Sequence, residues 1–166
     1  VTEMVGEFPE LQGLMGGYYA KAEGLPVEVA EAIRDHYKPV GASDEVPTAP
    51  TAVAVSLADK LDNLLSFFRI GILPTGSKDP FALRRAALGY LRLVQANGLK
   101  LELDQVVHAW ASQRVAGLPE KLGEFLLDRL AVQLRDEGVR HDYIQASRSW
   151  QGRPDMRVDR VGSRAR

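Results

Sequence analysis

Apolar side chains recur at three- and four-residue intervals along most of this chain, and that spacing places them on one face of an α-helix. Five apolar residues follow the spacing in segment 53–68: Leu57, Leu61, Leu64, Leu65 and Phe68. The same spacing marks four other segments: 28–37, 81–96, 104–110 and 119–137. No sustained alternation of apolar and polar residues accompanies it, and hairpin turn signals are absent. The pattern predicts an all-α, multi-helical protein.

Turn-forming residues separate these helical segments. Segment 38–50 contains Pro39, Pro47 and Pro50, and segment 70–78 forms a second loop. After the second loop, Asp79 is a good N-cap and Pro80 suits the first helical position, where its missing N–H costs nothing. We therefore expect a helix to begin at Pro80.

A further boundary is predicted near residues 117–119, where Gly-Leu-Pro interrupts the helical pattern. It divides a helical domain, residues 1–117, from a helical segment, residues 118–166. The last part, 148–166, carries six arginines and two aspartates with few apolar residues, and we expect it to be loosely packed. Because the chain starts inside a helical pattern without an initiator methionine, we also expect it to be a piece of a longer protein.

Composition narrows the class of protein. The 166 residues are 45% hydrophobic and 26% charged, which is typical of a globular domain with a packed core. The absence of cysteine excludes disulfides and thiolate metal sites. Neither a signal peptide nor an apolar run of membrane-spanning length is present, so we expect a cytoplasmic protein. The net charge of −1 means that a nucleic-acid surface would have to concentrate its positive groups locally.

Such a local concentration follows the second loop. Lys78, Arg84 and Arg85 lie close together around the predicted helix start, and Arg92 follows Arg85 by seven residues on one helix face. These cations suit an anionic partner such as RNA, or a pair of buried carboxylates. Gly71 and Gly76 followed by Ser-Lys resemble a phosphate loop. That motif, however, requires Gly-Lys-Ser/Thr after a strand, and both the order and the preceding helix argue against it.

Two carboxylates stand on the most apolar predicted helix. Asp59 and Asp62 are three residues apart and share a helix face, so we expect them to be buried and paired with Lys78, Arg84 or Arg85. The alternative is a metal site with His36, as in HD-type phosphohydrolases. A complete HD site needs a His-Asp doublet, and the one doublet in the chain, at positions 141–142, more simply marks a helix start. We favour structural pairing, and expect no metal, because unpaired buried charge is costly.

Several motifs in sequence order resemble the β subunit of the bacterial tetrameric glycyl-tRNA synthetase, over roughly residues 1–145. They are Met4-Val5-Gly6-Glu7-Phe8-Pro9-Glu10-Leu11-Gln12-Gly13, Met15-Gly16, Tyr18-Tyr19, His36-Tyr37-Lys38-Pro39, Leu57-Ala58-Asp59-Lys60-Leu61-Asp62, Pro74-Thr75-Gly76-Ser77-Lys78-Asp79-Pro80 and Arg84-Arg85-Ala86-Ala87. Each motif is weak alone, but the set in this order is highly specific.

The resemblance implies part of an α2β2 ligase that joins glycine to tRNA-Gly with ATP and Mg²⁺. In that family the α subunit holds the adenylation site, and the β subunit serves tRNA recognition and assembly. Residues 1–117 would form most of an HD-like domain, and residues 118–166 would lead toward an anticodon-binding domain. We expect no catalytic residue and no cofactor in this chain. The RNA-binding candidates are Lys78, Arg84, Arg85 and Arg92. The alternative functions are a metal-dependent phosphohydrolase and a purely structural helical module that holds the α subunit.

Overall fold

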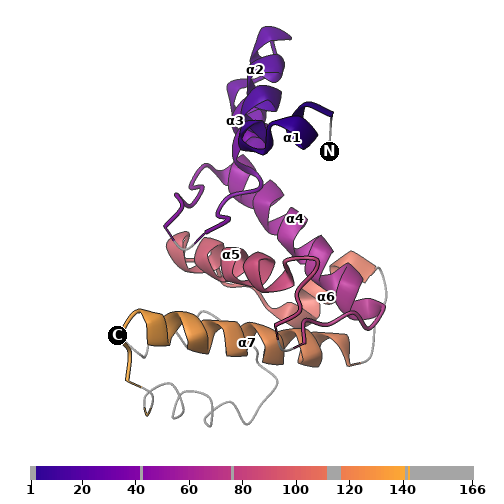
Figure 1. Cartoon of the computed structure of the whole chain (residues 1–166), viewed down its shortest axis with the longest axis vertical. Coiled ribbons are helices and arrows are strands. Elements are labelled where there is room, and N and C mark those ends of the chain that lie inside the picture. Colours follow the sequence, from indigo (N-terminus) through magenta and orange to yellow (C-terminus); the bar gives the residue numbers. More distant parts are fainter. Residues whose placement is uncertain (1–2, 42, 76, 112–116, 141, 143–166) are drawn as a thin grey trace. The chain divides into compact units, whose positions relative to one another are not determined.

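The computed structural model describes residues 3–41, 43–75, 77–111, 117–140 and 142, and these residues form helices joined by loops (Figure 1). The elements in order are α1 (Glu3–Glu7), the 3-10 helix η1 (Pro9–Leu11), α2 (Leu14–Ala22), α3 (Val27–Asp35), α4 (Pro50–Arg69), α5 (Leu83–Ala96), α6 (Leu103–Ala111) and α7 (Leu118–Asp136). Within the described residues no strand forms, only an isolated bridge between Thr75 and Lys78. The predicted all-α class is confirmed.

The chain divides into two compact units, residues 1–59 and residues 60–166, so that the division falls inside α4. The predicted boundary at residues 117–118 stays a prediction, as does the HD-like nature of the first domain. Helix α7, which follows that boundary, packs against α5 and α6 within the second unit. No helix in the described part of the chain combines the length and the apolar character needed to cross a bilayer.

In the first unit, α2 and α3 form a closely packed helical pair. Small residues permit the close approach: Gly17 is buried, and a Cβ added there would lie 3.1 Å from the carbonyl oxygen of Ala30. Gly13 precedes α2 with a φ of +74°, and a side chain at that position would collide with the carbonyl group of Arg34. The pairing of α2 with α3 therefore depends on the absence of side chains along this seam.

The loop after α3 is fastened to the first turns of α4. The Ser56 hydroxyl, fully buried, donates a 2.6 Å hydrogen bond to the carbonyl oxygen of Lys38. Farther along the loop, a carboxylate oxygen of Asp44 accepts hydrogen bonds from the backbone N–H groups of Val40 and Gly41. These bonds satisfy backbone groups that have no helical or sheet partner, as a loop of this length requires.

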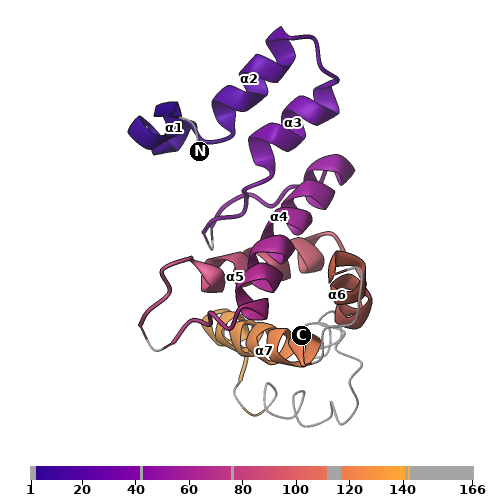
Figure 2. The same ribbon diagram turned by 90° about the vertical axis from the view of Figure 1, so that its right-hand side faces the viewer.

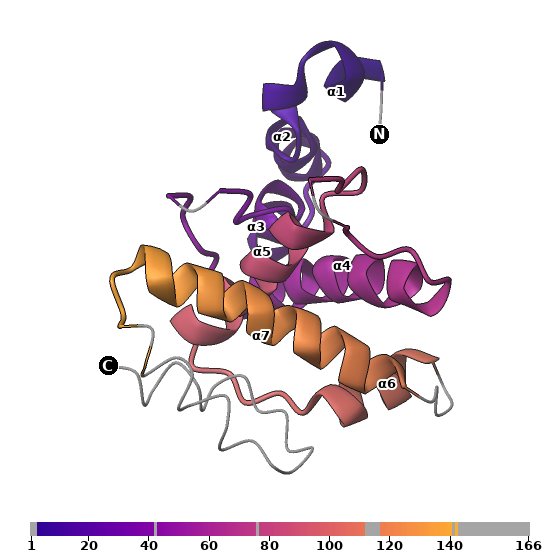
Figure 3. The same ribbon diagram turned by 60° about the horizontal axis from the view of Figure 1, so that its bottom comes forward.

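The second unit has an apolar core between α5, α7 and the last turns of α4. Helices α5 and α7 pack against each other (Figure 3). The rings of Phe68 and Phe125 lie 5.2 Å apart at their centroids, and Gln133 of α7 donates a 3.0 Å side-chain hydrogen bond to Gln95 of α5. Ten large side chains of these three helices are almost wholly buried: Leu64, Leu65, Leu83, Tyr90, Leu91, Leu93, Leu122, Leu126, Leu130 and Leu134. Their helical spacing confirms the predicted core faces of these segments.

Most predicted helices are confirmed with shifted ends. Helix α4 begins three residues before the predicted segment, and α6 begins one residue before its predicted segment, at Leu103. The doublet at positions 141–142 and the arginine-rich end, 148–166, lie outside the described residues, apart from Asp142.

Candidate nucleic-acid interface

The loop between α4 and α5 projects from the helices of the second unit (Figure 2). A glycine terminates α4 at the start of this loop: Gly71 adopts a φ of +78°. The N–H of Gly71 donates to the carbonyl of Phe68, and the N–H of Ile72 donates to the carbonyl of Phe67. Farther on, Thr75 and Lys78 exchange two backbone hydrogen bonds of 3.1 and 2.8 Å. Local hydrogen bonds thus fix both the exit of the loop from α4 and the backbone that carries Lys78.

Helix α5 begins three residues later than predicted. Asp79 is not its N-cap, because a turn precedes the helix. The N–H of Ala82 closes this turn with a 3.2 Å hydrogen bond to the carbonyl of Asp79. Ala82, the residue before the helix, adopts a left-handed φ of 53°. The Asp79 side chain nevertheless reaches the helix end, where its two oxygens accept the N–H groups of Leu83 and Arg84 at 2.8 and 2.9 Å. The carboxylate therefore occupies the place that a bound phosphate would need, which agrees with rejecting a phosphate loop.

The four predicted RNA-binding cations differ in exposure. Lys78 in the loop and Arg85 in the first turn of α5 are exposed. Arg84 and Arg92 are half-buried, and each already takes part in an interaction within the molecule. The structure therefore places Lys78 and Arg85 best to meet a partner, on either side of Asp79 in the sequence.

Aromatic and aliphatic side chains share this surface. Phe81, predicted to belong to the apolar face of a helix, lies in the turn before α5 and is 48% exposed. Its ring stacks on that of Phe67 with centroids 4.3 Å apart and an interplanar angle of 23°. Ile70, Ile72 and Leu73 are also exposed in the loop. Sequence spacing missed this feature because it assigned Phe81 to a helix that starts only at Leu83.

The predicted burial of Asp59 and Asp62 is wrong, since both side chains are exposed. At 100° per residue, they lie on the side of α4 opposite its buried stripe, which includes Leu57, Leu64 and Phe68. The Asp62 carboxylate accepts a 2.7 Å hydrogen bond from the indole N–H of Trp110. The buried charged group on this helix is instead Lys60, at 4% exposure, whose burial the apolar spacing did not predict.

The alternative metal site receives no support from the geometry. Among the described residues, no group of three or more histidine, cysteine or acidic side chains is arranged to hold a metal ion. The Nδ1 atom of His36 lies 2.8 Å from the carbonyl oxygen of Ile33, and its ring contacts that of Tyr37 edge-on. His36 therefore has a structural role at the end of α3.

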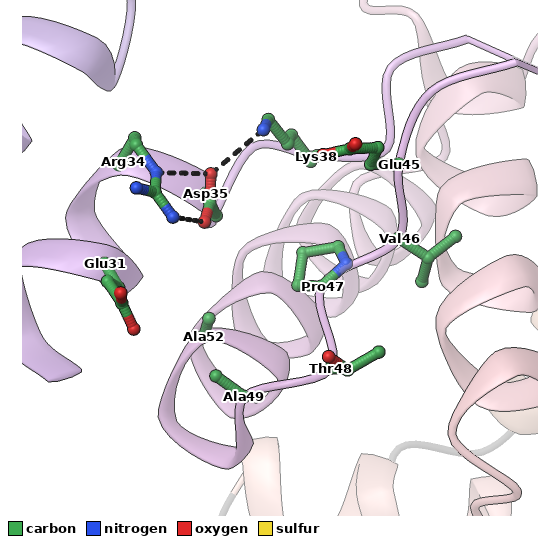
Figure 4. A pocket seen from close by; sticks show the side chains of 10 residues that line it. All are labelled: Glu31, Arg34, Asp35, Lys38, Glu45, Val46, Pro47, Thr48, Ala49 and Ala52. Atoms are coloured by element: carbon green, nitrogen blue, oxygen red, sulfur yellow. Dashed lines mark hydrogen bonds and ion pairs between the residues drawn. The ribbon is translucent and has the colours of Figure 1, made fainter.

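A cavity of about 210 Å³ lies in the first unit, between the end of α3 and the segment 45–52 (Figure 4). Arg34 donates two hydrogen bonds of 3.0 and 2.6 Å to Asp35, and the Lys38 ammonium lies 3.1 Å from the same carboxylate. The hydrogen bonds from Arg34, followed by the contact with Lys38, lower the pKa of Asp35 below its usual value. This cavity is a poor phosphate site, because Asp35 pairs with both cations and two further carboxylates, those of Glu31 and Glu45, line it.

Comparison with known proteins identifies the family of this chain. The profile of the family described as "Glycyl-tRNA synthetase beta subunit" matches residues 1–149. Two proteins named glycine–tRNA ligase beta subunit are similar to this chain. The one from Paracoccus denitrificans is 58% identical over 93% of this chain, and the one from Rhodospirillum centenum is 52% identical over 94%. A third, from Phenylobacterium zucineum, is 54% identical over 88%. The chain spans 22% of the length of the first two relatives. It belongs to the glycyl-tRNA synthetase beta subunit family.

Proposed function

We propose that this chain forms part of a glycine–tRNA ligase in the cytoplasm and that it contacts the backbone of tRNA-Gly through Lys78 and Arg85. Family membership supports the ligase assignment. The observation that supports the RNA contact is the exposure of both cations. The carboxylate near them in the sequence, that of Asp79, already accepts hydrogen bonds from two backbone N–H groups of α5. Arg84 and Arg92 are secondary candidates, because each has another interaction to give up first.

The electrostatic argument is local. The chain carries a net charge of −1, so long-range attraction to RNA is weak, and affinity must come from cations placed at phosphates. From Arg69 to Arg85 the sequence has four cations and one carboxylate, that of Asp79. Because the Asp79 carboxylate accepts two N–H groups at the positive end of α5, its charge opposes a neighbouring phosphate less than a solvated carboxylate would.

In this account the chain serves recognition and assembly. Its partners are the α subunit, which carries the adenylation site with ATP and Mg²⁺, and tRNA-Gly. The chain alone is then expected to support no glycine-dependent exchange between ATP and pyrophosphate. Detection of that exchange with the chain alone would contradict the division of labour.

The contact is tested by aminoacylation with the assembled α and β subunits. Lys78→Ala and Arg85→Ala are expected to raise the KM for tRNA-Gly several-fold each, on the order of 1 kcal/mol per lost charge-assisted contact. They are expected to leave ATP–pyrophosphate exchange unchanged. Lys100→Ala is the matched control, since Lys100 is exposed but lies after α5. Unchanged KM values for both variants would contradict the contact, and a loss of co-purification with the α subunit instead would favour a purely structural role.

A further inference from the structure

We propose that the stacked pair Phe67–Phe81 is a platform for an unpaired RNA base, with Lys78 and Arg85 holding the phosphates on either side of it. This inference rests on the proposed function and adds to it the kind of RNA structure that this surface recognises. It assigns a role to the ring face of Phe81, which is uncharged and has no role in the proposed phosphate contacts.

The first support is the geometry of the ring pair. The centroids of Phe67 and Phe81 are 4.3 Å apart and their planes differ by 23°, so the rings stack nearly face to face. Phe67 is half-buried on α4, next to core residue Phe68, whereas Phe81 is 48% exposed. An anchored ring thus supports an exposed ring from beneath. Base stacking on exposed aromatic rings is the common means of binding single-stranded RNA.

The second support is the fixed backbone around Phe81. Two residues before it, the Asp79 side chain binds the N-terminus of α5, and one residue after it, Ala82 adopts its left-handed conformation. The turn between them is closed by the backbone bond from Ala82 to Asp79. A ring held in place before binding loses little conformational freedom when a base stacks on it.

The third support is the charge around the ring. Lys78 and Arg85, both exposed, stand three residues before and four residues after Phe81, and Arg69 is exposed at the end of α4. An exposed apolar patch alone, including Ile72 and Leu73, would suit a protein partner equally well. The local excess of cations around an aromatic stack favours RNA. A base in a duplex has both faces covered by its neighbours, so the platform selects unpaired bases.

The experiment measures the affinity of the assembled ligase for tRNA-Gly, for a single-stranded RNA of about eight nucleotides, and for a duplex of the same sequence. Phe81→Ala is compared with Phe8→Ala, a matched control because Phe8 is also 48% exposed but lies in the first unit. Phe81→Trp retains a stacking face. Lys78→Ala and Arg85→Ala report on the phosphate contacts, and melting curves of both phenylalanine variants check folding.

We expect Phe81→Ala to weaken binding of tRNA-Gly and of the single strand roughly 5- to 100-fold, with little effect on the duplex. Its salt dependence should stay that of the unsubstituted enzyme, while Phe81→Trp and Phe8→Ala bind normally. If Phe81→Ala behaves like Phe8→Ala while the two cation variants reduce the salt dependence, only the platform is wrong. If no variant affects RNA binding, the proposed function fails as well. Loss of the α subunit from Phe81→Ala, with RNA affinity retained, would identify a protein interface and overturn the platform.

Discussion

The carboxylate of Asp79 accepts a 2.8 Å hydrogen bond from the backbone N–H of Leu83, the first residue of α5, although Asp79 lies four positions before that helix begins. Its second oxygen accepts the N–H of Arg84 at 2.9 Å. One side chain thereby links the turn that carries Phe81 to α5 and satisfies the first donors of that helix. The position of the exposed ring and of Arg85 follows from this contact.

Asp79→Ala is expected to lower the free energy of unfolding by about 1 kcal/mol, because two N–H groups at the start of α5 lose their acceptor. Urea denaturation followed by circular dichroism measures the change. Glu124→Ala, an exposed mid-helix substitution on α7, is the control and should be nearly neutral. Equal stability of Asp79→Ala and the unsubstituted protein would show that the cap contributes nothing.

The contact between Trp110 and Asp62 is expected to couple α6 to α4. Trp110 also lies under the Arg69 guanidinium, 5.8 Å from its ring centroid, so Trp110→Phe removes the N–H donor while an aromatic face remains. A double-mutant cycle of Trp110→Phe and Asp62→Ala should give a coupling energy of roughly 0.5–1.5 kcal/mol. Strictly additive effects of the two substitutions on stability would argue that the hydrogen bond is absent in solution.

Gly13→Ala is expected to be among the most destabilising single substitutions in the first unit. The new Cβ would meet the carbonyl group of Arg34, and the residue would keep a positive φ, at a combined cost of about 2–4 kcal/mol. Gly6→Ala is the control, since nothing lies within 4 Å of the Cβ built there. Proteolysis or hydrogen exchange of α2 and α3 reports the loss, and equal protection in both variants would contradict this close packing.

The stability of the first unit should depend on pH through the ionisation of Asp35. Its pKa is lowered in the folded state, first by the hydrogen bonds from Arg34 and then by Lys38, so its stabilising contribution is present above the ordinary value near 3.8. The contribution is lost as the pH falls through the lowered pKa. Arg34 is 39% exposed, so solvent screens the pair and the effect is small.

The measurement is the stability difference between the unsubstituted protein and Asp35→Asn, from urea titrations at neutral pH and in acid. The difference should shrink as the pH falls and disappear in strong acid. A difference that grows with acidity would mean that the folded state raises the pKa of Asp35.

Helical periodicity predicted the fold class, the long helices and their core faces. It did so because the burial of apolar residues at three- and four-residue spacing largely determines which segments form helices. It failed where a turn competed with a helix. Asp79 and Pro80 are favourable residues for a helix start, yet the left-handed Ala82 delays α5 to Leu83. Nothing in the local sequence distinguishes a cap from a side chain that reaches the helix end from the preceding turn.

The candidate site was only partly predictable for a related reason. The clustering of the loop cations can be predicted from the sequence, and their role at an RNA surface stays a prediction. The apolar character of α4 predicts burial for Asp59 and Asp62, but their angle around the helix axis places them on its exposed side. Contacts between distant residues, such as Trp110 with Asp62 and Phe67 with Phe81, depend on how the helices pack. Spacing within one helix carries no information about that packing.

The central claim, that Lys78 and Arg85 bind tRNA phosphates, is tested most directly by the salt dependence of tRNA-Gly binding to the assembled ligase. Each phosphate contact contributes close to one unit to the slope of log affinity against log salt concentration. The double variant Lys78→Ala/Arg85→Ala should therefore show a slope reduced by roughly one to two units, and Lys100→Ala should show none of this reduction. An unchanged slope in the double variant would contradict the account.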